Sequence, residues 1–116
     1  MTAPRIDSYR FGQIVVDGRT YTRDLIICPD HVTSPWVREE GHLVSPADLW
    51  DVMEAQPQVL VIGQGTFGRM DVASETRQLL EGAGIQVIAE PTSRAWETYN
   101  RLCKTQQVVA ALHLTC

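Results

Sequence analysis

The segment with the clearest ligand-binding pattern is the glycine-rich stretch 63–68. It reads Gly63-Gln64-Gly65-Thr66-Phe67-Gly68 and matches the G-x-G-x-x-G pattern of dinucleotide-binding proteins. The stretch follows an apolar run, and Glu90 follows the next apolar run, where such proteins place an acid that binds the ribose. Glycines at these positions would let the backbone approach a phosphate, and the next helix would supply N–H donors.

Two features of this stretch argue against a dinucleotide site. The following helix is predicted to begin near Asp71, so Gly68 lies outside it, and the Asp71 carboxylate would stand where a phosphate should bind. The chain has 116 residues, which leaves no room for the second half of a dinucleotide-binding fold. We therefore interpret 63–68 first as a turn between a strand and a helix.

The alternative is a site for a small anion or a nucleotide at one edge of a parallel sheet, where ligands of open α/β sheets bind. In that hypothesis Gly63, Gly65 and Thr92 hold the ligand, and Arg38 supplies the counter-charge. His42, close to Arg38 in the sequence, could add acid–base chemistry.

No pattern points to a specific reaction. The sequence lacks the G-x-S-x-G and H-E-x-x-H motifs, and its three histidines are widely spaced, so we expect no metal site and no cofactor. The chain ends with His113-Leu114-Thr115-Cys116, and a thiol-redox role for Cys116 beside His113 is a third hypothesis. An enzyme is therefore the less favoured interpretation.

Charge and composition restrict the partners. The net charge is −4, and the ten basic residues are scattered, which argues against nucleic acid as a partner. We expect no membrane association, because no apolar run approaches the ~18 residues of a span and no basic amphipathic helix is visible. The start of the chain lacks an apolar leader, and three cysteines are an odd set for disulfides, so we expect a cytoplasmic protein.

The first half of the sequence has strand character. Residues 8–16 and 19–27 are rich in β-formers and flank Asp17-Gly18, a strong turn signal, so we predict an N-terminal β-hairpin. Residues 28–44 show no period and predict a long loop, with room for a short extra strand.

The second half alternates between helix and strand. Helices are predicted from Ser45-Pro46, from Asp71 and from Thr92 or Ser93, and the strands between and after them are 59–62, 85–89 and 108–114. The apolar run 59–62 is typical of a strand covered on both faces. We predict a single α/β domain over residues 1–116 with one core, in which an N-terminal hairpin joins a mixed, mainly parallel central sheet and about three helices.

A protein-binding surface is the favoured functional hypothesis. Trp36 and Arg38 in the long loop and Phe67 in the glycine stretch are predicted to be exposed anchors for an unidentified protein partner, because Trp and Arg dominate binding energy at interfaces. Self-association is a further possibility.

Motifs spread over residues 8–116 resemble those of the adipogenesis-associated Mth-type domain family, of which a mitochondrial complex I assembly factor is a distant relative. The resemblance implies a compact α/β domain with a mixed central sheet and a second small β layer. It implies no established activity or cofactor, and the assembly-factor relative works through protein contacts. Relatives often carry an acidic-Gly-Arg turn where this chain has Thr105-Gln106-Gln107. The matching motifs are Phe11-Gly12, Trp36-x-Arg38, Gly41-His42, Val59-Leu60-Val61-Ile62-Gly63-x-Gly65, Gly84-Ile85, Thr92-x-x-Ala95, Tyr99-Asn100-x-Leu102, Val109-Ala110-Ala111 and His113-x-Thr115-Cys116.

Overall fold

The structure is a computed structural model that describes residues 3–116, and it contains two main sheets. The first has three antiparallel strands: β1 (Ile6–Arg10), β2 (Gln13–Val16) and β3 (Arg19–Tyr21). The second has five strands in the order β5-β4-β10-β7-β9. Their bounds are β4 (Leu25–Ile27), β5 (Val32–Thr33), β7 (Val59–Gln64), β9 (Gln86–Glu90) and β10 (Val108–His113).

The N-terminal region differs from the predicted single hairpin. Asp17 and Gly18 do form a turn with positive φ, but this turn joins β2 to β3, and an earlier turn at Phe11-Gly12 joins β1 to β2. The segment 19–27 is divided between the two sheets, because Leu25–Ile27 is buried on both faces and pairs with β10. The three-stranded sheet has one open face, so it cannot bury a strand on both faces.

The five-stranded sheet is mixed, as predicted, and its three longest strands, β9, β7 and β10, are parallel. Along β10, Val108, Ala110 and Leu112 face one apolar cluster, and Val109 and Ala111 face another. The prediction of one core was therefore wrong, because side chains alternate across a sheet that is covered on both faces.

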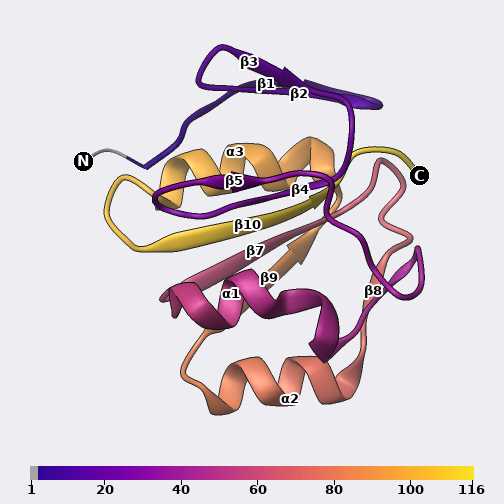
Figure 1. The fold of residues 1–116 in the computed structure, drawn as a ribbon, viewed down its shortest axis with the longest axis vertical. Helices are drawn as coiled ribbons and strands as arrows, with labels where there is room; N and C mark the ends of the chain where they lie inside the picture. The colour runs from indigo at the N-terminus through magenta and orange to yellow at the C-terminus, as the bar shows by residue number, and fades with distance from the viewer. Residues whose placement is uncertain (1–2) are drawn as a thin grey trace.

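Three layers enclose these two clusters (Figure 1). Helix α3 (Thr92–Leu102) and the three-stranded sheet cover one face of the central sheet, and α1 (Trp50–Ala55) and α2 (Ser74–Gly82) cover the other. The Asn100 side chain attaches α3 to β1, since it accepts from the Ile6 N–H and donates to the Ile6 carbonyl. None of the helices in residues 3–116 has the length and apolarity that crossing a membrane requires.

The predicted start of the second helix at Asp71 was wrong. Asp71–Val72 is a short strand, β8, which pairs in parallel with β6 (Leu43–Val44), and α2 begins only at Ser74. The pairing fixes the end of the long loop against the chain after the glycine stretch. Before α1, Pro46–Leu49 forms a 3-10 turn with a capping box between Ser45 and Asp48, as the Ser45-Pro46 pattern indicated.

Candidate functional site

A buried charged cluster lies where β4 begins and β10 ends. Leu25 of β4 pairs with Leu112 of β10, so the antiparallel register places Asp24 opposite His113. Nδ1 of His113 lies 2.7 Å from the Asp24 carboxylate, and Nη2 of Arg38 donates to it over 3.0 Å. The Leu114 N–H donates to the other carboxylate oxygen over 2.8 Å. We refer to Asp24, Arg38 and His113 as the Asp24 cluster.

Arg38 is held in place from several sides. Its guanidinium donates to the Gly41 carbonyl and lies 4.6 Å from the centre of the Trp36 ring. Trp36 itself is buried, and its indole N–H donates to the Asp48 carbonyl over 2.9 Å. The long loop is therefore packed against the domain through its charged and aromatic side chains.

The electrostatics of the cluster favour an ionised Asp24. Burial alone would raise the pKa of Asp24, but hydrogen bonds from His113, the Leu114 N–H and Arg38 outweigh it, so the pKa is lowered. The side chains of Arg38 and His113 are only 5% and 9% exposed. Within residues 3–116, Nη1 of Arg38 and Nε2 of His113 have no hydrogen-bond partner. With the proton on Nδ1, that Nε2 is an acceptor.

The glycine stretch packs directly against this cluster. The Gly65 N–H donates to the Thr92 hydroxyl over 2.9 Å, and that hydroxyl donates to the His113 carbonyl over 2.6 Å. A Cβ atom on Gly65, whose φ is +87°, would lie 2.8 Å from the His113 ring and 2.6 Å from the Thr115 carbonyl. A Cβ on Gly63 would lie 2.8 Å from the Thr92 hydroxyl. These glycines are required by close packing inside the chain.

The backbone N–H groups that would bind a phosphate already donate hydrogen bonds to other groups of the chain. The Thr66 N–H donates to the Thr115 carbonyl over 2.8 Å, and the Gly68 N–H donates to the Gly65 carbonyl over 3.2 Å. Together with the bond from Gly65 to Thr92, these contacts use the donors of the predicted anion cradle. The geometry agrees with the interpretation of 63–68 as a turn between β7 and the next element.

The predicted anchors divide into two groups. The side chains of Trp36 and Arg38 are buried, so the prediction that they form an exposed surface was wrong. The two side chains stack on each other, and Arg38 donates to the Asp24 carboxylate, which keeps both against the domain. Phe67 is 65% exposed. His42 is exposed at its position in the loop, and its ring lies edge-on to that of His113, with the centroids 5.7 Å apart.

Phe67 belongs to an exposed edge that also includes Phe11, which is 58% exposed. The Gly12 N–H donates to the Leu114 carbonyl, and the Thr66 N–H donates to the Thr115 carbonyl, each over 2.8 Å. The two loops therefore bind the segment after β10 at neighbouring residues. The Arg69 guanidinium lies 5.4 Å from the centre of the Phe67 ring. We call Phe11, Phe67 and Arg69 the aromatic edge.

Sequence reasoning missed Asp24 and a second cluster formed by Cys28, His31 and Asp51. In this second cluster one ligand atom from each side chain lies within 4.8 Å of the others. The spacing Cys28-x-x-His31 was the available signal in the sequence. For Asp24 there was no local signal, because its partner His113 is far along the chain and only the register of β4 and β10 brings them together.

Comparison with known proteins then identifies the family. The family described as "Protein of unknown function (DUF498/DUF598)" matches residues 6–113. The chain belongs to the DUF498/DUF598 family. Solved structures related to this family include Mth938-like domains, which confirms the resemblance to the Mth-type domain family.

Three solved structures are similar to this chain over almost its whole length. A conserved hypothetical protein, PH1505 from Pyrococcus horikoshii, is 25% identical with a TM-score of 0.83, over 97% of this chain and 99% of that one. The protein MT938 is also 25% identical, with a TM-score of 0.80, over 98% and 100%. A Mth938-like domain from Bordetella pertussis is 21% identical with a TM-score of 0.63, over 96% and 85%.

Proposed function

We propose that this domain is a non-catalytic protein-binding module of the assembly type and that the aromatic edge is its contact surface. The observation that carries the proposal is that two exposed phenylalanines, Phe11 and Phe67, lie in loops that both hydrogen-bond the segment after β10. Aromatic and arginine side chains contribute most of the binding energy at protein interfaces, and large exposed aromatics are otherwise unfavourable on a surface.

In this proposal the Asp24 cluster prepares the edge for binding. Asp24 accepts from the Leu114 N–H, and the Leu114 and Thr115 carbonyls accept from the two loops that carry the phenylalanines. A buried polar network makes the segments that it connects rigid. A rigid edge loses little conformational entropy on binding, which favours affinity.

The chemistry of the edge suggests the kind of partner. Arg69 stacks on Phe67 and offers a cation beside an apolar ring, so a protein segment with an apolar side chain followed by a carboxylate would fit. All three cysteines, which lie within the described residues, are free thiols. Free thiols support the cytoplasm as the proposed compartment.

The test compares Phe67→Ser and Phe11→Ser with the matched control Trp50→Ser, which removes an exposed aromatic from α1. Each protein is used as bait in quantitative capture from a lysate of its own cells, and the captured partner is then titrated as a purified protein. We expect Phe67→Ser to weaken that binding about 30-fold, the effect of a hot-spot residue, and Trp50→Ser to leave it unchanged.

Equal loss with Trp50→Ser, or binding that is indifferent to both phenylalanines, would refute the proposal. Light scattering of the purified chain over a range of concentrations separates a distinct partner from a second copy of the chain. Self-association that disappears in Phe67→Ser would identify the second copy as the occupant of the edge.

A second candidate function is binding of a small anion at the Asp24 cluster. The specific observation is that Nη1 of Arg38, a cationic donor, is buried without a partner among the described residues. The test is a thermal-shift panel of nucleotides, NAD(P), coenzyme A and organic acids. A ligand at 100 times its Kd should raise the midpoint by roughly 10 °C. Loss of the shift in Arg38→Gln would support this function, and a flat panel would remove it.

A further inference from the structure

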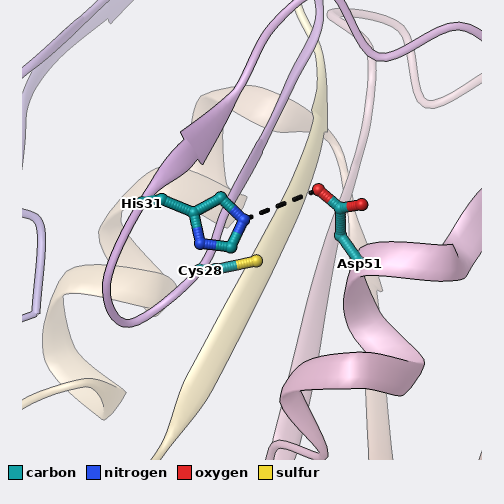
Figure 2. Close-up of side chains that lie close together, drawn as sticks. All are labelled: Cys28, His31 and Asp51. Carbon is teal, nitrogen blue, oxygen red and sulfur yellow. Dashed lines mark ion pairs between the residues drawn. The ribbon is translucent and has the colours of Figure 1, made fainter.

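A second cluster of chemically reactive side chains lies on the α1 side of the central sheet, away from both surfaces described above. Cys28 follows β4, His31 precedes β5, and Asp51 lies in the first turn of α1. One ligand atom of each lies within 4.8 Å of the others, and Nε2 of His31 is 3.7 Å from the Asp51 carboxylate. Figure 2 shows the three side chains pointing toward one another from two separate parts of the chain.

The local chain geometry explains why Cys28 and His31 share a face. They flank the turn Pro29-Asp30, and the Cys28 N–H donates to the His31 carbonyl over 2.8 Å, which extends the pairing of β4 with β5. Residues that face each other in an antiparallel ladder project to the same side. A cysteine and a histidine separated by two residues of a tight turn is a spacing typical of metal ligands.

Neighbouring groups orient the two polar ligands. Nδ1 of His31 lies 2.7 Å from the Asp30 carboxylate, so its proton is directed to Asp30 and the lone pair of Nε2 is directed to the cluster. The Thr33 hydroxyl donates to the Asp51 carboxylate. Carboxylate and hydroxyl partners behind the first ligands are the usual support of metal-binding histidines and carboxylates.

The groups that face each other in this cluster carry acceptor atoms or negative charge. The Nε2 lone pair of His31 and the Asp51 oxygen are both acceptors, and Asp30 adds further negative charge.

We propose that Cys28, His31 and Asp51 bind a divalent zinc-class metal ion through Sγ, Nε2 and a carboxylate oxygen. A tetrahedral zinc ion holds its ligand atoms about 3.3–3.7 Å apart. The His31–Asp51 separation of 3.7 Å already fits, and the separations from Cys28, which are at most 4.8 Å, have to close by about 1.5 Å at most. The combination of sulfur, nitrogen and oxygen favours zinc over calcium or magnesium, which take oxygen ligands.

Two of the three proposed ligands, His31 and Asp51, line a cavity. This cavity of about 280 Å³ adjoins the cluster and is lined by Asp30, His31, Trp50, Asp51, Glu54 and Ala55. A water molecule from this cavity would complete the tetrahedron.

The test uses the full, tag-free chain freed of metal by chelator. We expect saturable 1:1 Zn²⁺ binding, a rise in the thermal midpoint of roughly 10 °C at 100 times the Kd, and a thiolate-to-cobalt charge-transfer band with Co²⁺. Cys28→Ser should abolish the band. Because Cys28 is buried and its variant could be less stable, His31→Gln, at a position whose side chain is 53% exposed, provides the second variant and should weaken Zn²⁺ binding at least about 10-fold.

The matched controls are His42→Gln and Cys116→Ser, which remove a histidine and a cysteine outside the cluster and should leave Zn²⁺ affinity unchanged. The absence of saturable Zn²⁺ binding by the wild-type chain would overturn the proposal. Binding that survives in His31→Gln and is lost in a control variant would overturn it too, because the ion would then bind elsewhere. None of these outcomes depends on the protein partner of the aromatic edge.

Discussion

Two aspartate–histidine pairs in this protein share one contact distance and differ in everything around it. Nδ1 of His113 lies 2.7 Å from Asp24, and Nδ1 of His31 lies 2.7 Å from Asp30. The first histidine side chain is almost completely buried and the second is largely exposed. Arg38 adds a positive charge to the first pair, whereas the carboxylate of Asp51 adds a negative charge to the second.

The difference shows that surroundings decide what a short polar contact does. Around Asp24 the charges are compensated and the three residues come from distant parts of the chain, so the contact fixes the tertiary structure. Around His31 only Asp30 is a neighbour in sequence, and Asp51 comes from α1; carboxylates are in excess, and one side opens to a cavity. That arrangement is suited to a cation from solvent.

The largest expected effect comes from breaking the buried pair. In Asp24→Asn the Arg38 guanidinium keeps its charge inside the protein and loses its carboxylate. Loss of one partner of a buried ion pair costs about 3–5 kcal/mol, and we expect about 3 kcal/mol of unfolding free energy because Asp24 keeps some exposure. Equilibrium urea unfolding measures this loss.

The control for that experiment is Asp30→Asn, which removes the equivalent carboxylate from the exposed pair. We expect no measurable change in its urea midpoint, because exposed ion pairs contribute little to stability. Equal losses in the two variants would contradict the distinction between the pairs.

A smaller effect should follow from crowding the buried pair through Gly65. In Gly65→Ala the new methyl group would meet the His113 ring and the Thr115 carbonyl, at a φ of +87°. We expect a loss of about 2 kcal/mol in unfolding free energy. Gly84→Ala is the matched control, with a φ of +80° and no described atom within 4 Å of the new Cβ. Gly84→Ala should lose only about 1 kcal/mol of unfolding free energy, because only the backbone conformation is unfavourable for alanine.

The difference between these two glycine variants isolates the contact with the cluster. A thermal or urea midpoint for Gly65→Ala that equals the midpoint for Gly84→Ala would mean that the chain after β10 moves aside without cost. In that case the Asp24 cluster would not hold the aromatic edge rigid.

The smallest effect is the dependence of stability on pH. The folded-state pKa of Asp24 is lowered below its unfolded value of about 3.9, so its ionised form stabilises the fold above that pH. This contribution is lost as the pH falls through the folded-state pKa. Urea unfolding can be measured at a series of pH values from about 6 to about 2. The free energy of unfolding should fall less steeply with decreasing pH for Asp24→Asn than for the wild-type chain.

Repeating the same urea measurements at high salt should distinguish the pH-dependent stability contribution of Asp24 from that of Asp30. The hydrogen bond with His31 also lowers the pKa of Asp30, but the Asp30 side chain is exposed, and its contribution should vanish at high ionic strength. The Asp24 contribution should persist, because burial protects it from screening. An acid slope that salt removes completely in the wild-type chain would contradict this assignment.

The order of elements in the second half could be predicted from sequence because it depends on local patterns. The apolar run at 59–62 required burial on both faces, and Pro46 beside Ser45 marked a helix start. The first half was harder. Residues 8–16 have enough β character for one strand, but Gly12 adopts a positive φ and turns the chain inside the segment. Similarly, nothing local distinguishes Asp71–Val72 as a strand, because its partner β6 lies in the long loop.

The amino-acid sequence by itself determined the class of fold, the turn at Asp17-Gly18 and the family, since these rest on residue types and their spacing. Only the tertiary structure decided which side chains meet. The register of β4 against β10 brings Asp24 to His113, and the packing of α1 on the sheet brings Asp51 to Cys28 and His31. Spacing along a chain describes one face of one element, whereas a site between elements depends on register and packing.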